Sequence, residues 1–263
     1  MQTKKNLITK VINNEIINIQ DDIVIEEPLE IFINSKSQYF CMRLPGDDIA
    51  LAVGLCFIDG IIDSYADIKN IHYNPKENSN RLELELLNIK KDLKNTEQRI
   101  IKSSTGGIKG KDIADFFESK INKIEVTDHI IGSEIFNLQK DFLNKQSVFY
   151  STGGTHAVSI YNHRGKSLAF AEDVGRHNAM DKCIGKILIS DQMQEAFIAI
   201  LSSRLSYEMV SKACQLGLQI AAGTSAPTSL AIEIAKQCNL TLIGFLRDPK
   251  FNIYSCPERI INK

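Results

Sequence analysis

Residues 197–246 read FIAILSSRLSYEMVSKACQLGLQIAAGTSAPTSLAIEIAKQCNLTLIGFL and alternate short apolar runs with longer amphipathic segments. The runs FIAILSS, LQIAA and LTLIGFL predict strands, and the intervening SYEMVSKACQLG and APTSLAIEIAKQC predict helices. Alternating strands and helices are typical of a parallel sheet with helices packed on its faces. The stretch therefore predicts an α/β domain.

The segments that precede this stretch extend the same domain. THAVSIY and KSLAFA, residues 155–161 and 166–171, predict a hairpin around the turn NHRG, and NAMDKCIGKILI predicts a helix. SVFYS, residues 147–151, is interpreted as one more strand. Because a hairpin opens the series, we expect a mixed, partly parallel sheet.

The first half of the chain predicts mixed strands and one helix. Strands are expected in IVIEEPLEIFIN (23–34), RLELELL (81–87) and EQRIIKS (97–103). PGDDIALAVGLCFIDGII (45–62) predicts a helix that Asp47 could cap. We expect an α+β protein overall: a smaller N-terminal α+β region, residues 1–110, followed by the α/β domain, residues 111–263.

Composition excludes several classes of function. The 263 residues carry 31 basic and 32 acidic side chains, so the net charge of -1 lacks the basic surface expected of a nucleic-acid-binding protein. No apolar run approaches the roughly 18 residues of a membrane helix, and the first residues lack the pattern of a signal peptide. We expect a cytoplasmic protein with no membrane or nucleic-acid partner.

The six cysteines are scattered and form no C-x-x-C pair, which argues against a zinc ribbon. A disulfide framework is not expected in a cytoplasmic chain of this length. Each cysteine, taken singly, is predicted to be a small core residue.

Polar segments follow the predicted strands, at the ends where open α/β sheets bind ligands. If the strands are parallel, these segments bring Arg176, His177, Arg204, Ser225 and Arg247 to one crevice. We therefore predict a small-molecule site at the carboxyl ends of the strands.

The segment EDVGRHNAMDK, residues 172–182, supports an anion at this crevice. Arg176, His177 and Asn178 stand at a helix start, where unpaired amide groups favour anions. Asp181, four residues beyond His177, is predicted to orient the imidazole. A surface turn with a solvated salt bridge is the alternative for this segment alone.

Two glycine pairs were considered as phosphate loops. STGGTHA, residues 151–157, offers Thr152, Gly153, Gly154 and His156, and its glycines permit either a close approach of a ligand or a turn. SSTGGIKGK, residues 103–111, lacks the first glycine of a Walker motif and has Asp112 where Ser or Thr should follow the lysine.

Together these segments resemble the FdhD family, the accessory proteins needed for active formate dehydrogenase. The resemblance covers nearly the whole chain after about residue 22, and EDVGRHNAMDK combined with SRLSYEMV is its most specific part. It also runs through EEPLEIFIN, MRLPGDDIALAVGLCFIDGII, STGGTHA, SAPTSLAIEIA, LTLIGFLRD and PERI. The resemblance implies a cytidine-deaminase-like fold for the larger domain.

The resemblance also implies a function and partners. A cytoplasmic, usually dimeric sulfurtransferase would take sulfur from a cysteine desulfurase. It would pass the sulfur to a molybdenum or tungsten bis(molybdopterin guanine dinucleotide) cofactor destined for the formate dehydrogenase apoprotein. The cofactor segment implied by the family is Phe245, Leu246, Arg247, Asp248, Pro249 and Lys250. Asp173 is also a candidate cofactor-binding residue, together with the polar residues and glycines named above.

The family pattern S-S-C-G-x-C-G-K departs from this chain at both cysteines. Aligning its terminal G-K with Gly110 and Lys111 places Gly106 and Lys109 at the cysteine positions. Sulfur transfer needs a thiolate that can hold a persulfide, so no catalytic residue is assigned. Either another cysteine or a cysteine-bearing homologue supplies the sulfur, or the protein is a cofactor-binding chaperone without transfer activity.

A zinc-dependent deaminase is excluded by chemistry. Such enzymes need H-x-E and a distant P-C-x-x-C, whereas this chain has His156-Ala157-Val158 and no paired cysteines. We expect no metal site formed by protein side chains and no zinc.

Overall fold

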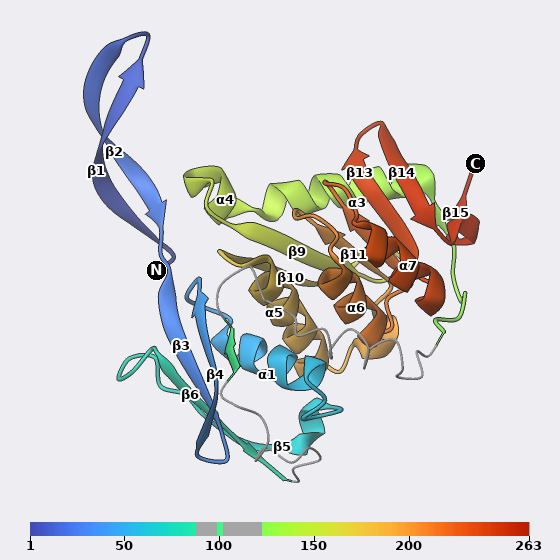
Figure 1. Ribbon diagram of the computed structural model, residues 1–263, viewed down its shortest axis with the longest axis horizontal. Coiled ribbons are helices and arrows are strands. Elements are labelled where there is room, and N and C mark those ends of the chain that lie inside the picture. Colours follow the sequence, from blue (N-terminus) through green and yellow to red (C-terminus); the bar gives the residue numbers. More distant parts are fainter. Residues whose placement is uncertain (88–98, 102–122, 263) are drawn as a thin grey trace.

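The structure, a computed structural model, describes residues 1–87, 99–101 and 123–262 (Figure 1). The chain begins with a long two-stranded ribbon, β1 (Thr3–Ile12) and β2 (Glu15–Val24), which projects away from the body. Asn13 and Asn14 both have positive φ in its turn, the conformation of a two-residue hairpin loop. The sequence prediction placed no hairpin here.

A five-stranded sheet follows, with strand order β5-β6-β3-β4-β7. Its strands are β3 (Glu27–Ile33), β4 (Lys36–Arg43), β5 (Ile68–His72), β6 (Arg81–Leu86) and β7 (Arg99–Ile101). These strands confirm the three that were expected in the first half, and helix α1 (Asp48–Ile58) confirms the predicted helix. Asp47 occupies the N-cap position, but its side chain makes no cap bond and pairs with Lys186 instead.

The second sheet has six strands in the order β10-β9-β11-β12-β13-β14. The strands are β9 (His156–Tyr161), β10 (Ser167–Asp173), β11 (Ile198–Leu201), β12 (Ile220–Gly223), β13 (Thr241–Arg247) and β14 (Lys250–Ser255). β9 and β10 form the predicted antiparallel hairpin, and β11, β12 and β13 are parallel. The mixed α/β fold is therefore confirmed.

Helices cover both faces of this sheet. They are α3 (Gly132–Lys145), α4 (Ser147–Thr152), α5 (Arg176–Ile189), α6 (Tyr207–Gln215) and α7 (Ser229–Cys238). α3 packs on one face through Ile135, Leu138 and Phe142, and α5, α6 and α7 pack on the other. Short elements complete the described chain: β8 (Ile130–Ile131), β15 (Ile260–Ile261), and 3-10 turns at Tyr65–Asp67, Met193–Glu195 and Pro257–Arg259.

One core joins the two sheets, because α1 packs directly on α5. The contact is made through glycines: a Cβ at Gly54 would collide with the carbonyl oxygen of Asp181, and one at Gly185 with that of Ala50. Only glycine permits helix backbones to approach this closely. The boundary expected near residue 110 lies outside the described residues.

A buried polar cluster reinforces this junction. The Lys182 ammonium, fully buried, pairs with Asp173 at 2.7 Å and donates to the carbonyl of Leu44 at 2.7 Å. Asp173 in turn accepts the amide of Leu44, and Asn178 donates to both Asp173 and the carbonyl of Met42. The end of β4 is thus tied to β10 and α5.

The expected strand at SVFYS is wrong, because these residues form helix α4. Glu172 accepts hydrogen bonds from the amides of Val148 and Phe149 at 3.1 and 2.8 Å, which caps the first turn of this helix. A carboxylate from β10 therefore overrides the strand propensity of Val148, Phe149 and Tyr150. Among the described residues, no helix is long and apolar enough to cross a membrane.

Replacing Gly185 by alanine should lower the free energy of unfolding by about 3 kcal/mol or more, because the new methyl group meets backbone that cannot move aside. Urea denaturation followed by circular dichroism measures this. Gly132→Ala is the matched control, since its Cβ would meet Phe251 at an ordinary 3.7 Å. Equal stability of the two variants would contradict the close helix contact.

Candidate functional site

A cleft lies at the carboxyl edge of the second sheet. β10 and β11 each run antiparallel to β9, and β11, β12 and β13 are parallel, so four carboxyl ends meet at one edge. The strand ends meet at one edge as predicted, but among the five residues expected in the crevice only Arg247 lines it; Arg176, His177, Arg204 and Ser225 do not. The cleft has a volume of about 560 Å³, in the usual range for small-molecule sites.

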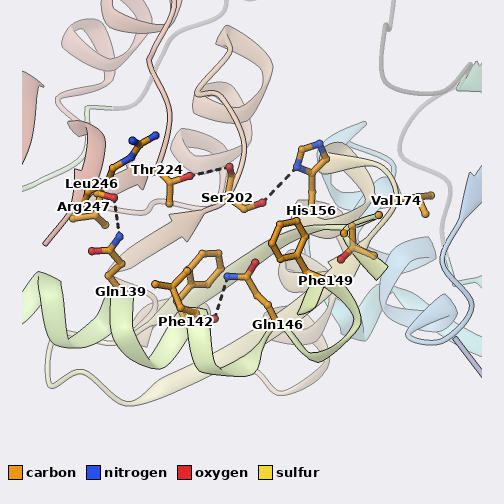
Figure 2. Close-up of a pocket in the computed structure, with 14 residues that line it drawn as sticks. Gln139, Phe142, Gln146, Phe149, His156, Val174, Ser202, Thr224, Leu246 and Arg247 are labelled. Atoms are coloured by element: carbon orange, nitrogen blue, oxygen red, sulfur yellow. Dashed lines mark hydrogen bonds between the residues drawn. The ribbon is translucent and has the colours of Figure 1, made fainter. Parts of the chain in front are cut away.

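Residues from seven elements or the loops next to them line this cleft (Figure 2). They are Gln139, Phe142, Leu143, Gln146, Phe149, Gly153, Gly154, Thr155, His156, Val174, Ser202, Thr224, Leu246 and Arg247. Five of them, Gly153, Gly154, His156, Leu246 and Arg247, were predicted from the sequence.

The polar wall is built from consecutive strand ends (Figure 2). The Ser202 hydroxyl accepts the amide of Ala157 at 2.9 Å and lies 3.4 Å from Nδ1 of His156. The Thr224 hydroxyl donates to the carbonyl of Ser202 at 2.9 Å. These bonds join the ends of β9, β11 and β12 into one polar wall.

The opposite wall comes from α3 and α4, with the rings of Phe142 and Phe149 (Figure 2). Gln139 holds the end of β13 in place: its amide group donates to the carbonyl of Leu246 at 2.7 Å and accepts from the amide of Asp248 at 3.2 Å. The cleft therefore has aromatic surface on one side and polar groups on the other, as is usual for small-molecule sites.

The electrostatics of the cleft favour an anion. Burial lowers the pKa of His156 below its ordinary value, and the charges of Arg176 and His177 lower it further. Arg176, the first residue of α5, has a buried Nε with no hydrogen-bond partner in the described structure. A ligand oxygen near this guanidinium and the start of α5 would meet positive potential from both.

His177 is not oriented by Asp181, so that prediction is wrong. Nε2 of His177 lies 2.9 Å from Glu208 on α6, and Asp181 is fully buried against Lys212 at 2.6 Å. Burial disfavours the charged form of Glu208, but His177, Arg176 and Lys212 outweigh it and lower the pKa of Glu208. Because α6 packs on α5, its side chains Glu208 and Lys212 become the partners of His177 and Asp181.

The other predicted residues lie around the cleft without lining it. Asp173 and Asn178 belong to the buried junction cluster. Thr152 ends α4 and accepts the amide of Gly154. Arg204 is exposed after β11, Ser225 follows β12, and Phe245, Asp248, Pro249 and Lys250 are exposed at the β13–β14 turn.

Sequence reasoning missed the α3 wall and two hydroxyls. Ile135, Leu138 and Phe142 follow helical spacing, which would have revealed α3. Ser202 and Thr224 stand directly after the apolar runs of β11 and β12, two positions before Arg204 and one before Ser225, the residues predicted from these segments. Gly106 and Lys109, the positions of the family's cysteines, lie outside the described residues.

The cysteine prediction is largely confirmed. Cys41, Cys56, Cys183 and Cys238 are buried, and Cys214 and Cys256 are partly exposed. Burial raises the pKa of Cys183 to about 12, and its thiol donates to the carbonyl of Val158. Cys183 is therefore a core residue and no candidate nucleophile.

Fold and cleft together define an α/β protein with a cleft of small-molecule size at the carboxyl edge of its sheet. The chain belongs to the FdhD/NarQ family, whose family model matches residues 24–261. The resemblance stated from the sequence motifs is confirmed.

Known relatives cover almost the whole chain. It is 37% identical over 264 residues to a sulfur carrier protein FdhD of Saccharolobus solfataricus, covering 99% of both chains. It is 31% identical to one from Streptomyces coelicolor, covering 98% of this chain and 95% of the relative. The solved structure of a putative formate dehydrogenase accessory protein from Desulfotalea psychrophila has the same fold, with a TM-score of 0.83 at 23% identity, covering 99% and 100%.

NMR titration should give His156 a pKa below the ordinary 6.5, and Arg176→Ala should move it upward because a neighbouring positive charge is removed. The folded protein binds this proton less tightly than the unfolded chain. The His156 contribution to stability is therefore present at high pH and lost as the pH falls below 6.5. Arg164→Ala, in the exposed β9–β10 turn, should leave the titration unchanged; a His156 pKa insensitive to Arg176 would contradict their coupling.

Proposed function

We propose that this protein is a sulfur carrier that serves as an accessory protein of formate dehydrogenase. In this role it binds a molybdenum or tungsten bis(molybdopterin guanine dinucleotide) cofactor and transfers to it sulfur from a cysteine desulfurase. Two relatives bear the name sulfur carrier protein, and the structural relative is described as a putative formate dehydrogenase accessory protein.

The observation that carries the proposal is the composition of the cleft. The segment implied by the family resemblance contributes Leu246 and Arg247 to the same cleft as Gly153, Gly154 and His156. Backbone at paired glycines, an arginine and a histidine are a combination that suits phosphate oxygens.

The residues present fit one nucleotide end of such a cofactor. Arg247, His156 and the backbone at Gly153 and Gly154 would hold phosphate, Arg176 would add positive potential, and Phe149 would offer a ring for stacking. When bound, the cofactor would supply the metal that receives sulfur. A bis-nucleotide ligand has two such ends, so we propose that a homodimer acts in the cytoplasm and offers two clefts.

The second candidate function is cofactor binding without sulfur transfer. It is favoured by one observation: glycine and lysine stand at positions 106 and 109, where the family pattern has cysteines. A thiolate is needed to accept and hold sulfur as a persulfide. The choice between the two functions therefore depends on whether another cysteine carries sulfur.

Guanosine diphosphate, measured by isothermal titration calorimetry, should bind the purified protein, and Arg247→Ala should weaken binding at least tenfold because a charge-assisted hydrogen bond is lost. Arg164→Ala keeps the same loss of charge outside the cleft and should bind like the unmodified protein. Binding unaffected by Arg247→Ala, or no binding at millimolar nucleotide, would exclude the cleft as the nucleotide site.

Sulfur loading distinguishes the two functions. The protein is incubated with a cysteine desulfurase and sulfur-labelled cysteine, and bound sulfur is measured by intact mass. A carrier should gain one or more sulfur atoms that a thiol reductant removes. If a C-x-x-C relative is loaded under the same conditions and this protein is not, the binding-only function stands.

A further inference from the structure

The β1–β2 ribbon is a sheet of two strands that projects from the body of the protein (Figure 1). Every residue from Thr9 to Asn18, which form the outer part of the ribbon, is exposed. An isolated two-stranded ribbon is only marginally stable in water unless another surface packs against it. The ribbon is therefore a candidate interaction surface.

Five isoleucines share one face of this ribbon. Paired residues of an antiparallel ribbon point to the same side, and the side alternates along each strand. The register places Ile8 opposite Ile19 and puts Ile12, Ile17 and Ile23 on the same side. Ile12 and Ile17, nearest the tip, are 44% and 40% exposed. We call these five residues the isoleucine face; a contiguous exposed apolar face of this kind is typical of an interaction site.

The charges on the isoleucine face are divided between its two strands. Lys4 and Lys10 lie on β1, whereas Glu15 and Asp21 lie on β2, and none of the four has an ion-pair partner among the described residues. β1 contains no acidic residue, and β2 contains no basic residue. A complementary surface must therefore be apolar at its centre, acidic over β1 and basic over β2. A second copy of the ribbon, with its β2 over β1, has this pattern.

The opposite face of the ribbon satisfies its polar groups internally. Lys5 pairs with Asp22 at 2.8 Å, and the Thr9 hydroxyl donates to Asn18 at 3.0 Å, each across the two strands. These polar pairs also interrupt the apolar side chains of that face. The isoleucine face differs because its charged groups lack partners and its apolar residues are contiguous.

We propose that the isoleucine face is the interface of a homodimer, in which two ribbons pack face to face with β1 of each copy over β2 of the other. Such a contact is isologous, because both copies contribute the same residues. Ile8 and Ile19 of the two copies meet at its centre, and Lys10 of each copy meets Glu15 of the second copy. The inference rests on the homodimer of the proposed function and assigns its interface.

The base of the ribbon connects this interface to the cleft. Val24, the last residue of β2, lies against Gly154, where a Cβ would be 2.6 Å from Cγ1 of Val24. Gly154 lines the cleft, and α4, which supplies Phe149 to the same cleft, packs on β2. Two ribbons packed together therefore join one cleft wall of each copy in a single assembly, as a ligand with two nucleotide ends requires.

Sedimentation velocity of the full chain at several concentrations measures the dimer. Ile17→Lys should weaken dimerisation by about tenfold or more, because a charge enters the apolar centre of the interface. Ile16→Lys is the matched control: Ile16 is the neighbouring residue, points to the opposite face and is 73% exposed. This variant should dimerise like the unmodified protein, and circular dichroism verifies that both variants are folded.

Charge reversal tests which strands meet between the copies. Lys10→Glu alone and Glu15→Lys alone should each weaken dimerisation by about tenfold, because like charges then face each other at two symmetric positions. An equimolar mixture of the two variants should recover the dimer, since the new glutamate of one meets the new lysine of the other. A contact within one copy cannot produce this recovery.

The possible failures are distinguishable. A dimer that persists in Ile17→Lys, that Ile16→Lys disrupts instead, or that the mixture does not recover would overturn the proposed interface and leave the homodimer standing. A chain that is monomeric at every concentration would overturn both. Guanosine diphosphate binding, measured on the same preparation, tests the nucleotide site independently of either result.

Discussion

The contact between α1 and α5 is the constraint on which the rest of the structure depends. Glycines at positions 54 and 185 bring the two backbones together, so α1 serves as a common layer between the N-terminal sheet and the helices of the second sheet. A side chain at either glycine would push the sheets apart and separate Leu44 from Asp173 and Lys182. The buried Asp173–Lys182 pair is tolerable because backbone groups satisfy its remaining hydrogen-bonding capacity, since a buried charge without such partners is strongly destabilising.

The same junction determines the electrostatics of the cleft. The charge of Asp173 is balanced by Lys182, and the neutral Asn178 donates to Asp173 and to the carbonyl of Met42. His177 is paired with Glu208, and Arg176 is left with a buried Nε that no described group satisfies. Residues that the sequence motif presents as one cluster thus divide into buried structural groups and Arg176, whose charge acts on His156 in the cleft. This division explains how a protein with a net charge of -1 can offer positive potential at one position.

Much of the fold was predictable, because local signals and tertiary packing agree over most of the chain. The runs of β11, β12 and β13 are short and apolar, and the helices between them carry a clear amphipathic period. The parallel arrangement of these strands, and the sheet edge at which the cleft lies, could therefore be predicted. Predictions failed where a distant side chain decided the outcome. Glu172 converts SVFYS into a helix from 24 residues away, and Lys212 takes Asp181 from 31 residues away. The cleft was identified by its strand ends, whereas its α3 wall depends on how a helix before the sheet folds back onto it.

Alternation of strands and helices also explains why the two edges of the second sheet differ in the residues they present. Strand carboxyl ends leave polar loops and helix amino ends on one edge, which favours anions. Helix carboxyl ends lie at the other edge, where Cys214 and Cys238 close the apolar layer between α6, α7 and the strands. Small polarizable thiols pack well there, so a structural role is sufficient to retain either one alone.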